Sequence, residues 1–159
     1  MEYYIINESV YEKVKARIAS AKKDKAKIVF TNNDDEFSRK ILEKLGNEID
    51  IYLINLAWRR DMQKQREAGF NQVIAKICAK ANIVIGINFD EIIESRNLKE
   101  KSEILGRIRQ TIKLCNKNKL KMKFIILKKE NERNIYDLKS LGLIFGMPTW
   151  MTSNLLYMI

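Results

Sequence analysis

Short apolar runs rich in β-branched residues alternate along this chain with segments of helical periodicity. The runs lie at residues 3–6, 27–30, 49–54, 82–87, 123–127 and, more weakly, 143–145. Segment 70–81 shows the helical pattern, because one face collects Phe70, Val73, Ile74, Ile77 and Ala81. Strands that alternate with helices in this way predict a parallel sheet whose strands are joined by crossover helices.

The length of the chain limits how far such a sheet extends. A complete eight-stranded (β/α) barrel takes about 250 residues, whereas this sequence has 159. An incomplete barrel and a compact open sheet both fit, and we predict an α/β, TIM-like (β/α) barrel that is incomplete or reduced in strand number. No linker, internal repeat or low-complexity tract divides the sequence, so we expect residues 1–159 to form a single domain.

Polar side chains follow the apolar strands, at the end where folds of this type bind ligands. Residues 81–90, ANIVIGINFD, change from apolar to polar in this way. The carboxylates at such ends are Asp34, Asp35, Asp90 and Glu91. Oxygen ligands of this kind suit Mg²⁺. Asp34 or Asp35, and likewise Asp90, also precede helical segments, and we favour their capping free helix N–H groups.

The charge of the chain favours a polyanionic partner. Thirty Lys and Arg residues against 20 Asp and Glu leave a formal charge of +10. The sequence has no histidine, which excludes imidazole general bases, imidazole metal ligands and catalytic triads built on histidine. Neither of the glycine-rich phosphate-binding motifs occurs, so a standard nucleotide-binding loop has no support.

The remaining composition indicates where the protein acts. Its two cysteines are far apart and fall on predicted helices, which indicates buried apolar positions in a reducing compartment and not a zinc cluster. No run reaches the roughly 20 apolar residues that a membrane helix needs, and no signal peptide opens the sequence. We therefore expect a cytoplasmic protein without a membrane partner.

Two segments are candidates for contact with nucleic acid. WRRDMQKQREAG, at residues 58–69, follows the third strand and carries Arg59, Arg60, Lys64 and Arg66. These cations can neutralise phosphates, and Trp58 offers a face on which an unpaired base can stack. An ordinary charged loop with a buried tryptophan is the alternative. The position of the segment at a strand end favours nucleic acid.

The second segment is the helix expected at residues 98–117. Its inward stripe holds Leu105, Ile108, Ile112 and Cys115. Lys101 lies over that stripe near the helix start, where its stem can cover apolar surface while its ammonium group reaches the strand-end face. The alternative, which we favour on local grounds, is that the ammonium group simply reaches water. Arg109 flanks the same stripe.

Three blocks in fixed order carry a family resemblance. EAGFNQVIAKICAKANIVIGINFDEII is similar to a loop, helix and strand block, and EKSEILGRIRQTIKLC places Lys101 and Arg109 where the family tends to carry basic residues. ERNIYDLKSLGLIFGM fits an R-[SN]-x-x-D-L pattern through Arg133 and Asp137. Over residues 55–147 the chain thus resembles the thirty-kilodalton, PHP-barrel-like protein subunit of archaeal and eukaryotic ribonuclease P.

The resemblance implies a noncatalytic subunit that binds and stabilises the ribonuclease P RNA for removal of the 5′ leader from precursor tRNA. Its partners are then that RNA, an RRM-like ribonuclease P protein, other ribonuclease P proteins and, indirectly, precursor tRNA. Mg²⁺ is bound by the RNA, and the protein holds neither a cofactor, nor a metal, nor a catalytic residue. The RNA contacts that we expect are Trp58, Arg59, Arg60, Lys64, Arg66, Lys101, Arg109, Lys128 and Arg133.

Two other functions stay open at this point. One is a Mg²⁺-dependent phosphoesterase of the PHP-like barrel class, which would use the four carboxylates at the strand ends. The other is a protein-interaction module, in which the apolar tail TWMTSNLLYMI at residues 149–159 binds a partner helix. We favour packing of this tail against one side of the barrel.

Overall fold

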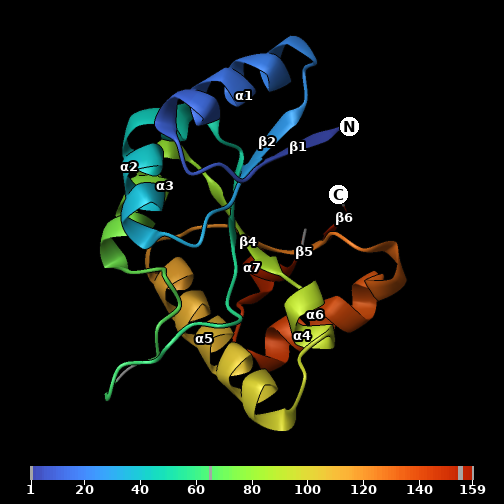
Figure 1. The fold of residues 1–159 in the computed structure, drawn as a ribbon. Coiled ribbons are helices and arrows are strands. Elements are labelled where there is room, and N and C mark those ends of the chain that lie inside the picture. The colour runs from blue at the N-terminus through green and yellow to red at the C-terminus, as the bar shows by residue number, and fades with distance from the viewer. Residues whose placement is uncertain (1, 65, 154–155, 159) are drawn as a thin grey trace.

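Strands and helices alternate along the chain (Figure 1), and the computed structural model describes residues 2–64, 66–153 and 156–158. The strands are β1 (Tyr3–Ile6), β2 (Lys27–Phe30), β3 (Ile51–Ile54), β4 (Val84–Asn88), β5 (Met122–Ile126) and β6 (Leu156–Met158). The helices are α1 (Tyr11–Lys23), α2 (Asp35–Leu45), α3 (Gln72–Ala81), α4 (Asp90–Ile93), α5 (Leu98–Lys117), α6 (Ile135–Ile144) and α7 (Thr149–Thr152). Two 3-10 turns, η1 (Gly46–Glu48) and η2 (Lys129–Asn131), complete the described elements.

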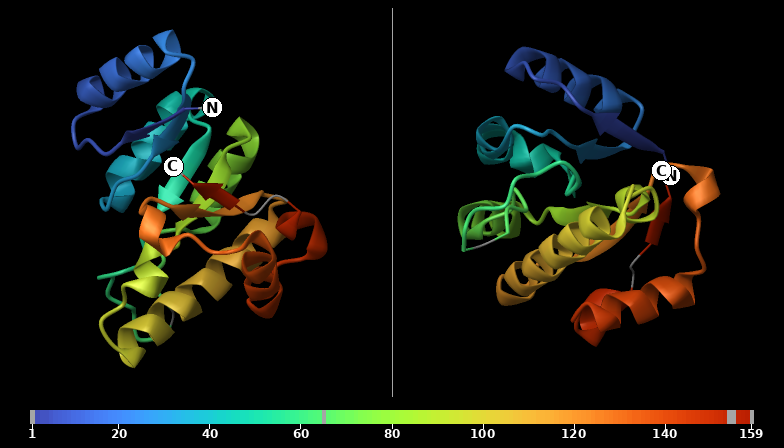
Figure 2. Two further views of the ribbon diagram at one scale, coloured as in Figure 1. Left: turned by 90° about the vertical axis from the view of Figure 1, so that its right-hand side faces the viewer. Right: turned by 60° about the horizontal axis from the view of Figure 1, so that its bottom comes forward.

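The strands of the sheet lie side by side in the same order as along the chain. Its six strands lie in the order β1-β2-β3-β4-β5-β6, and each adjacent pair is parallel. This is the strand order of a (β/α) barrel, in which each crossover steps to the next strand. Both views of Figure 2 show the two ends of the chain on the same side of the molecule. The prediction of an α/β fold with a parallel sheet of reduced strand number is confirmed.

The two faces of the sheet belong to separate apolar clusters. The large cluster joins helix residues such as Ile41 and Ile108 to alternate strand residues such as Phe30 and Phe124. The small cluster contains only strand residues, namely Val29, Ile51, Leu53 and Ile125. Because side chains alternate between the faces of a strand, the helices cover one face while the other forms a narrow inner core. This division matches the outside and inside of a barrel wall.

Gly86 of β4 shows how closely the inner face is packed. A Cβ atom at this position would lie 2.9 Å from Cγ1 of Ile125 and 3.1 Å from Cγ2 of Ile51. The strand therefore needs glycine where it faces its two neighbours.

Two details of the predicted elements are wrong. Residues 143–145 are not a strand, because they form the last turn of α6 and its C-cap, where Leu143 and Ile144 are exposed. Three apolar residues do not by themselves distinguish a strand from a helix end. The sixth strand is β6, which lies in the apolar tail and pairs with β5. Val73 of α3 is also exposed and does not join Ile74 in the core.

Helix α5 packs against the sheet along one side and carries charge along the other. Asn97 caps its first turn by accepting a hydrogen bond of 2.9 Å from the Glu100 N–H. Its buried residues are Ile104, Arg107, Ile108, Thr111, Ile112 and Cys115. Within the described ranges, no helix is long and apolar enough to cross a membrane.

Candidate nucleic-acid interface

A row of amide side chains lies across the carboxyl ends of β2, β3 and β4. The Asn55 side-chain amide donates to Oγ1 of Thr31 at 3.0 Å and to Oδ1 of Asn33 at 3.3 Å. Its own oxygen accepts a hydrogen bond of 3.2 Å from the Asn88 amide. Asn88 is the polar residue that ends the apolar strand β4. The row therefore ties the three strand ends into one polar edge.

The loop that follows β3 is held to this edge by two ionisable side chains, of which Arg107 is buried and Glu91 is half-buried. Arg107, which is 2% exposed, reaches from α5 and donates to the carbonyl oxygen atoms of Leu56 at 2.7 Å and Arg59 at 2.8 Å. Oε2 of Glu91 accepts the N–H groups of Leu56 at 2.6 Å and Ala57 at 3.2 Å. Burial raises the pKa of Glu91, and these two N–H groups oppose that shift. The loop backbone is thus clamped from both sides.

Asp61 fixes the next part of the loop. Its carboxylate accepts hydrogen bonds of 3.0 Å from both Arg107 and Arg66, and one of 2.8 Å from the Glu67 N–H. Burial by itself raises the pKa of Asp61, but the Glu67 N–H and the guanidinium groups of Arg107 and Arg66 lower it below its ordinary value. The carboxylate is therefore held in its charged form.

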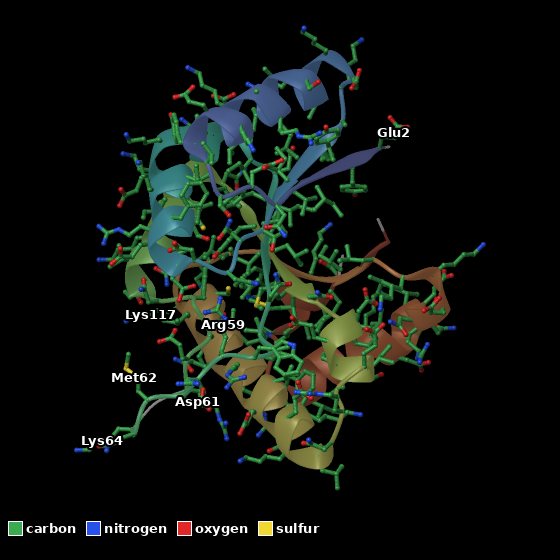
Figure 3. All side chains as sticks on the ribbon, viewed as in Figure 1. Glu2, Arg59, Asp61, Met62, Lys64 and Lys117 are labelled. Atoms are coloured by element: carbon green, nitrogen blue, oxygen red, sulfur yellow. The ribbon has the colours of Figure 1, made fainter. Side chains whose placement is uncertain are left out.

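The Arg59 side chain lines the site and is mostly shielded from solvent. Only 11% of its side chain is exposed, and its guanidinium donates to both oxygen atoms of Asp35 at 3.1 Å and to the Asn55 carbonyl at 2.7 Å. Gly69, at φ +64°, lies directly against that guanidinium, and a Cβ atom would collide with it. Arg59 and Asp61 are labelled in Figure 3, where Met62 and Lys64 point away from the body of the molecule.

Trp58 projects from the clamped loop. It is 73% exposed and has the left-handed backbone conformation, at φ +61°. The Arg96 guanidinium lies 3.7 Å from the centroid of its ring, within the range of a cation–π contact. The alternative of a tryptophan buried in the core is wrong, because this side chain is exposed.

A cleft of about 530 Å³ opens beside this tryptophan. Its lining residues are Asn33, Asn55, Ala57, Trp58, Arg59, Arg60, Glu67 and Glu91. Three of the expected contacts, Trp58, Arg59 and Arg60, therefore come together in one cleft. Its walls also include two carboxylates, so it is not a uniformly cationic site.

A second groove, of about 660 Å³, gathers three more of the expected contacts. Its lining residues are Arg66, Leu98, Lys101, Ser102, Leu105, Gly106, Arg109 and Phe145. Lys101 is half-buried and Arg109 is exposed on the same helix. Apolar side chains thus form part of this groove together with three cations.

The last three expected contacts lie apart from both cavities. Lys64 is exposed on the loop after β3. Lys128 forms an ion pair of 2.7 Å with Glu94, and the hydrogen bond that its ammonium group donates to that carboxylate raises the pKa of Lys128. Arg133 is exposed before α6, where its guanidinium donates to the Glu132 carbonyl.

The strand-end carboxylates are all engaged by protein donors. Asp34 caps α2 by accepting from the Phe37 N–H at 3.0 Å, as predicted. The predicted cap at Asp90 is wrong, because α4 begins at this residue and its carboxylate instead accepts from the Leu127 N–H at 3.0 Å and the Asn131 amide at 2.8 Å. In the described part of the chain, no three His, Cys, Asp or Glu side chains gather to hold a metal ion.

Sequence reasoning missed two residues that build the site. Arg107 was detectable, because it lies three residues after Ile104 and four before Thr111 on the inward side of α5, where an arginine needs buried acceptors. Arg96 was not, since no local pattern connects it with a tryptophan in another loop.

Comparison with known proteins adds a structural relationship. No family model and no curated protein matches this sequence, whereas four chains of known structure do. The fold is similar to that of a chain in ribonuclease P. The structure concerned is described as a "cryo-EM structure of archaeal Ribonuclease P with mature tRNA", and the match has a TM-score of 0.64 and 17% sequence identity. It covers 95% of this chain and 76% of that chain. At this identity the match establishes the fold alone.

Proposed function

We propose that this chain is a noncatalytic protein subunit of an archaeal-type ribonuclease P of the thirty-kilodalton, PHP-barrel-like family. The observation that carries the proposal is the structural match over 95% of the chain to a component of that ribonucleoprotein. The formal charge of +10 and the two strand-end cavities that contain cations are consistent with it. The chain then binds and stabilises the catalytic RNA in the cytoplasm, where the RNA removes the 5′ leader of precursor tRNA.

The proposed mechanism is electrostatic. Arg60, Lys64 and the cations of the second groove screen RNA phosphates, which lets the RNA strands approach one another. Lys128 and Arg133 extend the contact along the same end of the sheet. Mg²⁺ is held by RNA oxygen atoms in this proposal. The carboxylates Asp90 and Glu91 are engaged by protein donors, which disfavours the alternative of a Mg²⁺-dependent phosphoesterase.

Protein partners belong to the same proposal. Leu98, at 86% exposed, and Ile144, at 68% exposed, are large apolar side chains at the surface, and Leu98 lines the second groove. Exposed apolar groups of this size favour contact with another subunit. An RRM-like ribonuclease P protein is the partner that we propose for the assembly, alongside other ribonuclease P proteins.

Reconstitution tests the proposal. The ribonuclease P RNA of the source cell is assayed for cleavage of precursor tRNA with and without this chain and its protein partners. We expect cleavage at limiting Mg²⁺ to require the chain, and Lys101→Glu combined with Arg109→Glu to abolish that effect. Lys15→Glu combined with Lys23→Glu, the same double charge reversal at exposed positions of α1, is the matched control that keeps it.

Binding to the RNA gives the second measurement. Affinity is expected to fall by roughly 0.7 to 0.9 log units per neutralised phosphate for each tenfold rise in salt. A salt-independent affinity contradicts the RNA-binding role. Cleavage of a phosphodiester by the purified chain alone, lost in Asp90→Asn, favours the phosphoesterase instead.

A further inference from the structure

We propose that Trp58 and Arg96 form a stacking site for one unpaired nucleobase, whose edge enters the cleft beside Trp58 and whose phosphate stays near Arg60. The inference rests on the proposed function, because it assumes that the ligand is RNA. It adds the kind of nucleotide recognised and the residue that makes the principal contact.

The backbone of Trp58 is the first reason. A bulky L-residue in the left-handed region costs roughly 1 to 2 kcal/mol, and such residues cluster at ligand sites because the surrounding structure holds them there. In this protein, two side chains hold the backbone around Trp58. Arg107 bonds the carbonyl groups on both sides of Trp58, at Leu56 and Arg59, while Glu91 bonds the preceding N–H groups. The clamp thus keeps an exposed indole in a conformation that the free loop disfavours.

The Arg96 guanidinium is the second reason. It lies 3.7 Å from the ring centroid and forms an ion pair of 3.5 Å with Glu100, which also accepts the Arg96 N–H at 2.8 Å. Arg96 covers one face of the indole, and it is not among the described residues that line the cleft. In the proposed complex a base stacks on the opposite face and completes a guanidinium–indole–base stack, a form of contact that unpaired bases favour.

The cleft itself suits a base better than a phosphate. Glu67 and Glu91 line it, and their negative charge opposes a phosphate group. Oε1 of Glu67 accepts the Gly69 N–H, and Oε2 of Glu91 accepts the two loop N–H groups. Carboxylates are acceptors only, so they match the amino groups of adenine, cytosine and guanine. Uracil has no exocyclic amino group, and its one donor on this edge, N3–H, lies between two carbonyl oxygen atoms that the carboxylates repel. We infer that uracil binds more weakly.

Tryptophan fluorescence tests the stack directly. The chain has two tryptophans, so Trp150→Phe leaves Trp58 as the reporter. Short single-stranded oligonucleotides of A, C or U are titrated at low salt. We expect quenching by A and C, with U binding roughly 2- to 12-fold more weakly, as the loss of one hydrogen bond implies.

Substitutions separate stacking from charge. Trp58→Ala is expected to weaken binding of the A oligonucleotide roughly 5- to 150-fold, the range of one lost base–aromatic stack, while Trp58→Phe retains most of the affinity. Arg96→Gln weakens binding about 2- to 5-fold. Lys23→Gln, which removes the same charge from the last turn of α1, is the matched control and leaves affinity unchanged.

The outcomes distinguish this inference from the function on which it rests. Equal affinities of wild type and Trp58→Ala, or an unquenched Trp58, overturn the stacking site even if the ribonuclease P RNA still binds with a steep salt dependence. If Trp58→Ala binds the oligonucleotides as well as wild type does but no longer binds a protein subunit, the tryptophan is a protein contact and the inference is also wrong. Failure of wild type to bind ribonuclease P RNA removes the proposed function, whatever the oligonucleotides do.

Discussion

Replacement of Arg107 by methionine is the sharpest test of how the site is built. Methionine keeps an unbranched apolar side chain in the helix but supplies none of the hydrogen bonds that the guanidinium makes. The substitution leaves the carbonyl groups of Leu56 and Arg59 without this donor and removes one cation from Asp61. The perturbation therefore acts on the loop after β3 through a single residue of α5.

The expected magnitude follows from the burial of each group. An unsatisfied buried carbonyl costs about 1 to 3 kcal/mol, and loss of one partner from a buried ion pair costs about 3 to 5 kcal/mol. The side chain of Asp61 is 24% exposed and keeps Arg66, so the second figure is reduced. We expect a loss of about 3 kcal/mol in the free energy of unfolding, from a total of about 5 to 15 kcal/mol for a domain. The chain remains folded.

Urea unfolding and amide hydrogen exchange measure this loss. For a chain of this size, about 3 kcal/mol corresponds to roughly 6 to 12 °C in the melting temperature. The Leu56 and Ala57 amides, bonded to Glu91, are expected to exchange faster in Arg107→Met than in wild type. Arg107→Lys keeps the charge but not the planar fork of donors, so its free energy of unfolding is expected to lie between those of wild type and Arg107→Met.

Arg109→Met is the matched control on the same helix. Arg109 is exposed, so its replacement is expected to change stability by no more than about 0.5 kcal/mol. If Arg107→Met is no less stable than Arg109→Met, or if the Leu56 and Ala57 amides exchange at the wild-type rate, Arg107 does not clamp the loop. The geometry assigned to Trp58 then loses its support as well.

Three further predictions follow from single observations. Trp58→Gly is expected to be more stable than Trp58→Ala by about 1 kcal/mol in urea, because glycine accepts the left-handed backbone; equal midpoints count against the strain. The pKa of Asp61 lies below its ordinary value of 3.8, so its stabilisation is complete above pH 3.8 and is lost as the pH falls through the lower folded value. The unfolding free energies of wild type and Asp61→Asn should therefore differ at neutral pH and converge in acid, and a constant difference contradicts this. Gly69→Ala displaces the Arg59 guanidinium that fixes the loop and is expected to lower the free energy of unfolding in urea by more than Gly146→Ala, which shares the positive φ but whose Cβ atom meets nothing within 4 Å; equal losses contradict this role.

The sheet was predictable because each of its first five strands is an apolar run bounded by polar residues and followed by a helical pattern. β6 was not predictable in this way. It has three residues, and its assignment depends on pairing with β5, which is a tertiary contact. The same limit explains the error at residues 143–145, where an apolar run ends a helix that begins at the Asn134 cap.

The sequence predicted that polar side chains after β2, β3 and β4 lie together, since strand ends converge in any parallel sheet. It did not predict the contacts that these side chains make. The acceptor of Arg107 at Leu56 lies 51 residues away in the sequence, and no local pattern reports a contact of that separation. Asp90 failed as a predicted cap for a related reason, because its partners come from the segment after β5.

The distribution of the cations explains why net charge alone is a poor guide to the proposed RNA-binding surface. Arg59 and Arg107 both lie near the strand ends. The Arg59 guanidinium donates to Asp35, and the Arg107 guanidinium donates to Asp61 and to the Leu56 carbonyl. Because these donors are already engaged, neither arginine is available to neutralise a phosphate. Their role is to fix the loop. In the proposed complex, the exposed cations such as Arg60 and Arg109 act from defined positions, which lowers the entropy lost when a polyanion binds. Part of the positive charge thus orders the surface on which the rest is displayed, and substitutions of the two groups should separate into losses of stability and losses of salt-dependent affinity.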